Sequence, residues 1–202
     1  RVWRLARRSA AIWRNVAPAA GIRIDQEGLL VVGQRPESSA VLDAFMATEM
    51  GDGCQRLNPS SVADLCPQAH APAGAILSTH DLRVESREAL PRLAAWLAEV
   101  HGVRFRFGSA VVGMETGRVA LANGEALAAD AIFVCPGDDW ASLFPSIYAE
   151  ESITRCKLQM LRTAPQPVGW KLGPALCAGL TMAHYDSFGF CPSLPELRRH
   201  FE

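Results

Sequence analysis

Apolar residues recur at helical spacing in three parts of the chain. Residues 1–17 place them on one stripe with arginines opposite, and no cap precedes them, as in a helix that begins earlier. A second such segment begins at Pro36 and closes at Gly51. The third runs from Ser86, a residue suited to cap a helix, to Gly102, a residue suited to end one. The spacing predicts three amphipathic helices.

Shorter stretches alternate apolar and polar residues, as is typical of strands. Residues 22–25 and 29–32 flank a turn at Gly28 and predict a hairpin. The dipeptide Asn123-Gly124 predicts a turn farther along the chain. Additional short strands are predicted over residues 103–107, 110–114, 119–121 and 131–135.

The segment from residue 51 to residue 80 is rich in Pro, Ser, Gly and Ala. This composition predicts a loop, with one short helix over residues 59–65. Helices and strands follow one another along the chain without a repeat of fixed period. The pattern as a whole predicts a mixed α/β fold of the α+β kind.

Composition and charge exclude several classes of protein. Of the 202 residues, 49% are hydrophobic, which is too many for an intrinsically disordered chain. Lys and Arg number 20 against 21 Asp and Glu, so a net charge of −1 provides no basic surface for nucleic acid. No apolar stretch approaches the roughly 18 residues that span a bilayer. We therefore expect no nucleic-acid partner and no membrane span, and the oligomeric state stays open.

The six cysteines predict reduced thiols in a cytoplasmic protein. None forms a C-x-x-C pair or stands near a histidine at metal-ligand spacing, so no metal is expected. Ser78, His80 and Asp81 are the residue types of a serine hydrolase. The chain contains no G-x-S-x-G elbow to present the nucleophile, and a serine hydrolase is therefore not expected.

The order of elements between residues 86 and 140 is more specific than any single residue. A helix leads into Gly-Val-Arg-Phe at 102–105 and then into a strand around Val111, and a short meander ends at Gly137 after an apolar strand. This order resembles the FAD-dependent oxidoreductases of the D-amino-acid oxidase family, in the branch of the glycine and sarcosine oxidases. The resemblance implies that FAD is the cofactor, that Val111 contacts its adenine through the backbone, and that Gly137 packs beside it. Cys135-Pro136 departs from the Ala-Thr or Ala-Ser that is commoner in the family.

The resemblance continues on both sides of this region. Residues 28–32 are similar to a hairpin strand, residues 154–162 to the strand after the cofactor domain, and residues 184–188 to part of the substrate-domain sheet. The family's G-x-G-x-x-G, whose amides hold the FAD pyrophosphate, is absent. The resemblance therefore implies an internal fragment: a partial FAD-binding Rossmann-like domain without its first βαβ unit, and part of an antiparallel-sheet substrate domain. The expected parts are a mixed segment at 1–77, an FAD-binding portion at 78–145 and a substrate-domain portion at 146–202.

His184 and Tyr185 are the first candidates for contact with a substrate. On the substrate-domain sheet they would place a general base and a phenol against an amine, although they equally suit a hydrogen-bonded pair at a sheet edge. Lys157 and Gln159 have the same parity in a predicted strand, so both side chains would point to one face. A lysine there would stabilise a reduced, anionic flavin, and the alternative is a solvated strand face.

The first functional hypothesis is a fragment of an FAD-dependent oxidoreductase that oxidises the C–N bond of a small amine or amino acid. Hydride would pass to the flavin, and aminophosphonates are among the candidate substrates. Two alternatives remain open. One is a catalytically inactive, flavin-free α+β module, suggested by the absent pyrophosphate loop. The other is a fragment of a flavin-dependent hydroxylase, which shares the cofactor architecture.

Overall fold

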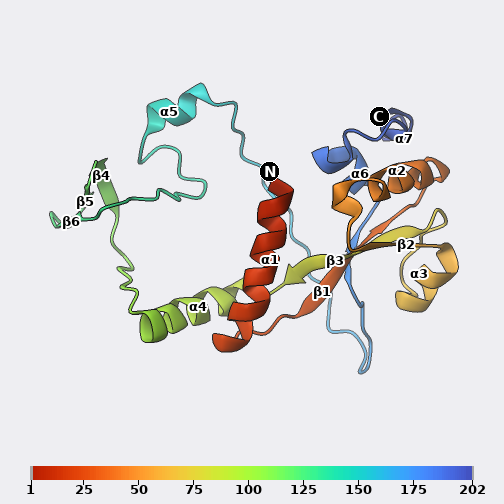
Figure 1. Cartoon of the computed structure of the whole chain (residues 1–202), viewed down its shortest axis with the longest axis horizontal. Helices are drawn as coiled ribbons and strands as arrows, with labels where there is room; N and C mark the ends of the chain where they lie inside the picture. Colours follow the sequence, from red (N-terminus) through yellow and green to blue (C-terminus); the bar gives the residue numbers. More distant parts are fainter. Residues whose placement is uncertain (1, 202) are drawn as a thin grey trace. The chain divides into compact units, whose positions relative to one another are not determined.

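The computed structural model describes residues 2–201, which form two compact units. Residues 104–166 make up the second unit, and the other described residues make up the first. Each unit contains both helix and strand, so the predicted mixed α/β fold is confirmed (Figure 1). Between residues 2 and 201 no helix combines the length and the apolar character that crossing a membrane requires.

The first unit is built on a four-stranded sheet with the order β2-β3-β1-β7. Its strands are β1 (Gln26–Val32), β2 (Cys54–Leu57), β3 (Ala75–Arg83) and β7 (Ala175–Cys177). Neighbours run antiparallel except β1 and β7, which are parallel. β2 and most of β3 lie within the segment predicted as a loop. They form strands because β2 pairs with β3 and β3 pairs with the apolar β1. The composition of the segment does not predict this pairing.

The predicted hairpin over residues 22–32 is wrong. Residues 22–25 form no strand, and Gly28 lies inside β1 with a φ of 86°. At this glycine the pairing of β1 with β3 shifts its register, so the residue belongs to a bulge and not to a turn. The partners of β1 are distant in sequence, and local alternation therefore could not reveal them.

The predicted helices are present. They are α1 (Val2–Ala19), α2 (Pro36–Met46), α3 (Pro59–Leu65) and α4 (Ser86–His101), and a 3-10 turn, η1 (Glu49–Gly51), follows α2. α4 ends at Gly102, whose φ of 65° is the left-handed conformation typical of a glycine at this place. Its N-cap is Glu85 and not Ser86, because the Glu85 carboxylate accepts the Arg87 N–H at 3.3 Å.

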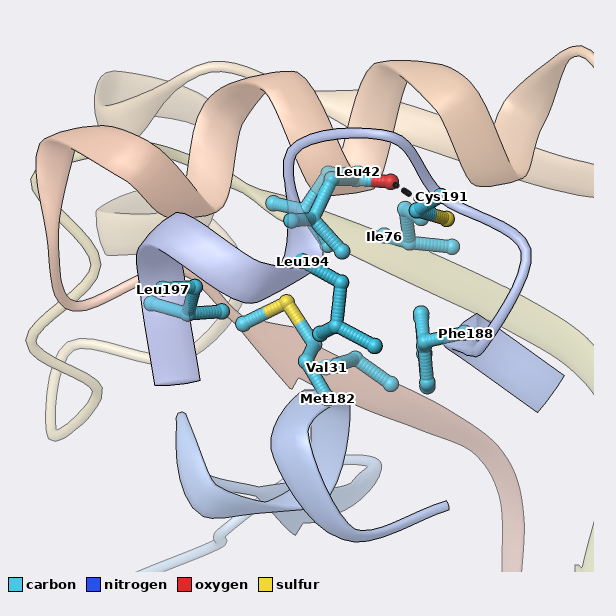
Figure 2. Packing of buried hydrophobic residues seen from close by; sticks show 9 residues of the cluster. Val31, Leu42, Ile76, Met182, Phe188, Cys191, Leu194 and Leu197 are labelled. Atoms are coloured by element: carbon cyan, nitrogen blue, oxygen red, sulfur yellow. Dashed lines mark hydrogen bonds between the residues drawn. The ribbon is translucent and has the colours of Figure 1, made fainter. Parts of the chain in front are cut away.

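Apolar side chains pack on both faces of the first unit's sheet, because successive strand residues point to opposite sides. On one face α2 and three short helices, α6 (Leu180–His184), η2 (Asp186–Phe188) and α7 (Leu194–Arg198), enclose Val31 and Ile76 (Figures 1 and 2). On the other face α3 packs against Leu30 and Val32. The first of these faces also carries the candidate site.

The second unit contains the predicted meander. Its antiparallel strands are β4 (Val111–Glu115), β5 (Arg118–Leu121) and β6 (Ala126–Ala128), and α5 (Pro145–Glu150) follows. Strand predictions failed where the structure supplies no neighbour to accept the backbone hydrogen bonds. Phe107 and Phe133 stay 80% and 89% exposed as a result. Between residues 103 and 162, the incorrectly predicted strands are residues 103–107, 131–135 and 154–162.

Candidate active site

A cavity of about 340 Å³ lies in the first unit, on the sheet face that α2 and α6 cover. Leu29 and Val31 of β1 and Ile76 of β3 contribute its apolar floor. Phe45 and Phe188 also line it, with ring centroids 4.9 Å apart. The cavity is therefore a largely apolar space over the centre of the sheet, of the size and lining that suit a small molecule.

A few polar groups complete the lining. Ser78 donates its hydroxyl hydrogen to the Asp81 carboxylate at 2.6 Å. Burial raises the pKa of the Cys54 thiol, and the negative charges of Asp81 and Asp52 add to this effect against the hydrogen bond of Ser78. Cys54 is therefore a protonated thiol and a poor nucleophile. All six cysteines are free, and no cluster of metal-ligating side chains occurs within residues 2–201.

Tyr185 lines this cavity, and His184 stands beside it. Their rings meet edge to face, with centroids 5.3 Å apart and planes at 82°. Tyr185 is 58% exposed and His184 is exposed as well, so a small molecule can reach both. The predicted strand over residues 184–188 is wrong, because α6 ends at His184 and η2 follows Tyr185. Met182 and Phe188 of this segment are buried in the core, which favours helical turns over an extended strand.

Lys157 and Gln159 lie in the second unit, on a segment without regular secondary structure. Both residues are exposed. Because residues 154–162 pair with no strand in the described chain, the inference that the two side chains share one face does not hold. Their role beside the flavin stays a prediction.

Val111 begins β4, which is an edge strand in the second unit. The preceding residue, Ala110, accepts the Ala122 N–H at 2.9 Å through its carbonyl. Since the backbone groups of successive strand residues point to opposite sides, the N–H and C=O of Val111 face the open edge of β4. Gly137 has a φ of 65°, and nothing lies within 4 Å of where its first side-chain carbon would stand. The second unit thus presents the outward-facing N–H and C=O of Val111 and, at Gly137, backbone with open space beside it.

Ser78, His80 and Asp81 do not form a hydrolase triad. Ser78 contacts Asp81 directly, while Nε2 of His80 lies 2.7 Å from the backbone oxygen of Asp52. A triad requires the histidine between the hydroxyl and the carboxylate. The geometry therefore agrees with the exclusion of a serine hydrolase.

The family of the chain follows from comparison with known proteins. Residues 1–194 match the model of the DAO family, the FAD dependent oxidoreductases. The chain belongs to this family. The predicted family is thereby confirmed, and with it the FAD dependence that characterises its members.

Two solved structures resemble this fold. L-proline dehydrogenase from P. horikoshii superposes with a TM-score of 0.65 over 90% of this chain, at 15% sequence identity. Glycine oxidase from Bacillus cereus ATCC 14579 superposes with a TM-score of 0.50 over 62% of this chain, at 20% identity. The chain spans 50% of the length of the dehydrogenase and 38% of the oxidase. No curated protein sequence matches it.

In the second unit, the backbone at Val111 and Gly137 can be compared with what the adenine part of FAD requires. A backbone donor beside a backbone acceptor, as at Val111, can pair with the hydrogen-bonding edge of an adenine. The bare backbone at Gly137 permits close approach of a flat group. The pyrophosphate needs a glycine-rich loop at a helix N-terminus, and the sequence contains no G-x-G-x-x-G. The residues present therefore fit the adenine side of the cofactor.

Sequence reasoning missed most of the cavity. Cys54 and Ser78 pair across β2 and β3, two strands that were predicted to be loop. The apolar run Ala75-Ile76-Leu77 directly after Gly74 was a usable signal for β3. The sequence suggests Asp81 only as part of a triad, because nothing in it places this residue over an apolar sheet face.

Proposed function

We propose that the protein is an oxidoreductase that removes hydride from the carbon next to nitrogen in a small amine or amino acid, with aminophosphonates among the candidates. The observation that carries this proposal is the apolar cavity with Tyr185 in its lining, in a chain of the DAO family. The two similar structures, a dehydrogenase of L-proline and an oxidase of glycine, are named for small amino acids. These names support a substrate of that size.

The side chains divide the work according to their chemistry. Bound FAD would supply the hydride-acceptor chemistry. Leu29, Val31 and Ile76 seat the substrate's carbon skeleton and exclude water from it. The Tyr185 hydroxyl hydrogen-bonds the polar end of the substrate, and an imidazole nitrogen of the neighbouring His184 accepts the proton that leaves the amine.

The second unit serves the cofactor in this proposal. The backbone N–H and C=O of Val111 hold the adenine, and Gly137 lets the cofactor lie against the chain. Lys157 and Gln159 are further candidates of the second unit for contact with the flavin, where the ammonium of the lysine would stabilise negative charge.

The test is flavin reduction in the protein encoded by the complete reading frame around this chain, loaded with FAD. Amines, amino acids and aminophosphonates are added without oxygen, and bleaching of the flavin absorbance is followed. At least one of these compounds should bleach the flavin within seconds to minutes. If none does so while dithionite still reduces the flavin, the proposal is wrong.

Two variants test whether the substrate is oxidised in the cavity that Tyr185 lines. The chain has only two tyrosines, Tyr185 in the cavity lining and Tyr148 in α5 of the other unit. Tyr185→Phe should lower the bleaching rate about tenfold or more, the range for loss of a positioned hydrogen-bonding group. Tyr148→Phe is the matched control and should leave the rate unchanged. Equal rates in the two variants would remove Tyr185 from the site.

A further inference from the structure

Among residues 2–201, Asp81 is the only charged residue that lines the cavity. In this described part of the chain, no Arg, Lys or His belongs to the lining, and the Asp81 carboxylate forms no ion pair. Its hydrogen bond comes from Ser78, a neutral hydroxyl. Asp81 is exposed, and its carboxylate borders the apolar lining of the cavity.

A bulge brings Asp81 to the cavity. Leu29 of β1 pairs with Ser78 of β3, yet Glu27, two residues away on β1, pairs with Leu82, four residues away on β3. Simple alternation would place His80 on the face of Ser78, but the extra residues of β3 bring Asp81 there instead. Bulges of this kind often re-aim a side chain next to a functional site.

The Asp81 carboxylate is part of the cavity lining, so its negative charge lies next to any molecule bound there. It is among the charges that oppose ionisation of the Cys54 thiol, which is another lining residue. A cation in the cavity would therefore be stabilised and an anion repelled. Leu29, Val31 and Ile76 provide an apolar surface close to this charge, which matches a molecule with one cationic and one apolar end.

We propose that the cavity is a subsite for the ammonium group of an amine with an apolar substituent, and that the Asp81 carboxylate, oriented by Ser78, pairs with that cation. This inference rests on the proposed function and narrows it. Among small amines and amino acids, the cavity selects compounds whose nitrogen end has no carboxylate or phosphonate beside it, because no Arg, Lys or His of residues 2–201 lines it. The apolar substituent lies over the sheet floor.

Direct binding to the 202-residue chain tests this subsite without flavin or turnover. Isothermal titration calorimetry compares benzylamine, benzyl alcohol and benzoate, which share a ring and carry a positive, a zero and a negative charge. Benzylamine should bind about tenfold more tightly than benzyl alcohol. This is the gain in affinity expected from one charge-assisted hydrogen bond at a partly exposed site. Benzoate should bind more weakly than benzyl alcohol.

Variants test whether the preference for benzylamine over benzyl alcohol comes from the Asp81 carboxylate. Asp81→Asn should weaken benzylamine about tenfold and leave benzyl alcohol unchanged, because the hydrogen bond to Ser78 survives while the charge is lost. Asp81→Glu keeps the charge and should retain most of the preference. Asp64→Asn, at an exposed aspartate of α3 outside the lining, is the matched control and should bind all three compounds like the parent.

Two results would overturn the subsite. One is benzylamine binding no more tightly than benzyl alcohol to the parent chain. The other is equal benzylamine affinity in Asp81→Asn and Asp64→Asn, with matching thermal melts showing that both variants are folded. Neither result touches the flavin-bleaching test, so failure of the subsite and failure of the proposed oxidation are told apart.

Discussion

Arg56 joins separate segments of the first unit through a single guanidinium. Its Nε donates to the Asp43 carboxylate at 2.8 Å, and Nη2 donates to Ser39 Oγ and to the Ala73 carbonyl, both at 3.0 Å. Nη1 donates to the Leu57 carbonyl at 2.9 Å. The fork of donors on an arginine can satisfy so many oxygens at once, and only 26% of this side chain is exposed. The contacts hold α2 and β2 to the loop that precedes β3.

Gly74 lies next to this guanidinium, and a substitution at Gly74 tests how tightly the contacts around Arg56 are packed. Its φ is 76°, and an added Cβ would collide with the Leu57 carbonyl oxygen and the Arg56 guanidinium. Gly74→Ala should therefore lower the free energy of unfolding by about 2 kcal/mol or more, since strain at positive φ is joined by a steric clash. The measurement is urea unfolding followed by circular dichroism.

Gly102→Ala is the control for Gly74→Ala. Gly102 has a similar φ of 65°, but nothing lies within 4 Å of its added Cβ. Conformational strain alone should cost about 1 kcal/mol there. Equal losses in the two variants would show that the contacts around Gly74 are not tight.

At the scale of elements, α7 is fixed to α2 by one polar contact and a set of apolar ones. Nε2 of His200, just beyond α7, lies 3.1 Å from Oε1 of Glu37 in the first turn of α2. Leu194 and Leu197 of α7 are buried in the cluster that contains Leu42 (Figure 2). Tertiary packing of an apolar face is what stabilises helices as short as α6 and α7.

The Glu37 contact predicts a pH dependence of stability. A hydrogen bond from the residue's own backbone N–H and one from His200 hold the pKa of Glu37 below its ordinary value of 4.5. Because the folded-state pKa is the lower one, the stabilisation is present above pH 4.5 and is lost as the pH falls below it. Glu37→Gln should therefore be less stable than the parent at neutral pH, with the difference shrinking on acidification.

Thermal melting across a series of acidic buffers measures this difference. Glu196→Gln is the control, because Glu196 is an exposed carboxyl of α7 without an ion pair in the described residues. Its melting temperature should follow that of the parent at each pH. A Glu37→Gln curve that runs parallel to the parent curve would contradict the assigned role of Glu37.

The short helix α6 predicts a second effect at this scale. Met182 is fully buried, whereas Leu180 of the same helix is 61% exposed. Met182→Ala should lower the free energy of unfolding by about 2–5 kcal/mol, the range for a large core side chain replaced by alanine. Leu180→Ala should change it by no more than about 0.5 kcal/mol, as expected at the surface. Urea titrations of both variants decide this, and similar midpoints would show that α6 is not packed as described.

For the whole molecule, the cofactor is the informative ligand. Val111 and Gly137 are proposed to hold the adenine side of FAD, while the chain contains no G-x-G-x-x-G to hold the pyrophosphate. We therefore expect the 202-residue chain to leave gel filtration colourless after incubation with FAD. The protein from the complete reading frame should elute yellow under the same conditions. Flavin absorbance that elutes with the shorter chain would show that the adenine side is sufficient for tight binding.

The sequence by itself determined the longer helices and the family. Apolar spacing at Leu90, Leu93 and Leu97 reports one face of a helix whatever surrounds it, and Gly102 marks its end through its own conformational freedom. The order of helix, strand and meander around Val111 is also a local pattern, and it was enough to identify the DAO family.

The tertiary structure alone decided the strands and the cavity. A strand depends on a neighbour that can be far away in the chain, so β3 appeared where a loop was expected, and residues 131–135 failed to form a strand. The lining of the cavity depends on that pairing as well. Asp81 reaches the apolar floor because β3 bulges opposite β1. The bulge arises from the pairing of these two strands, and the residue pattern predicts neither the pairing nor the bulge.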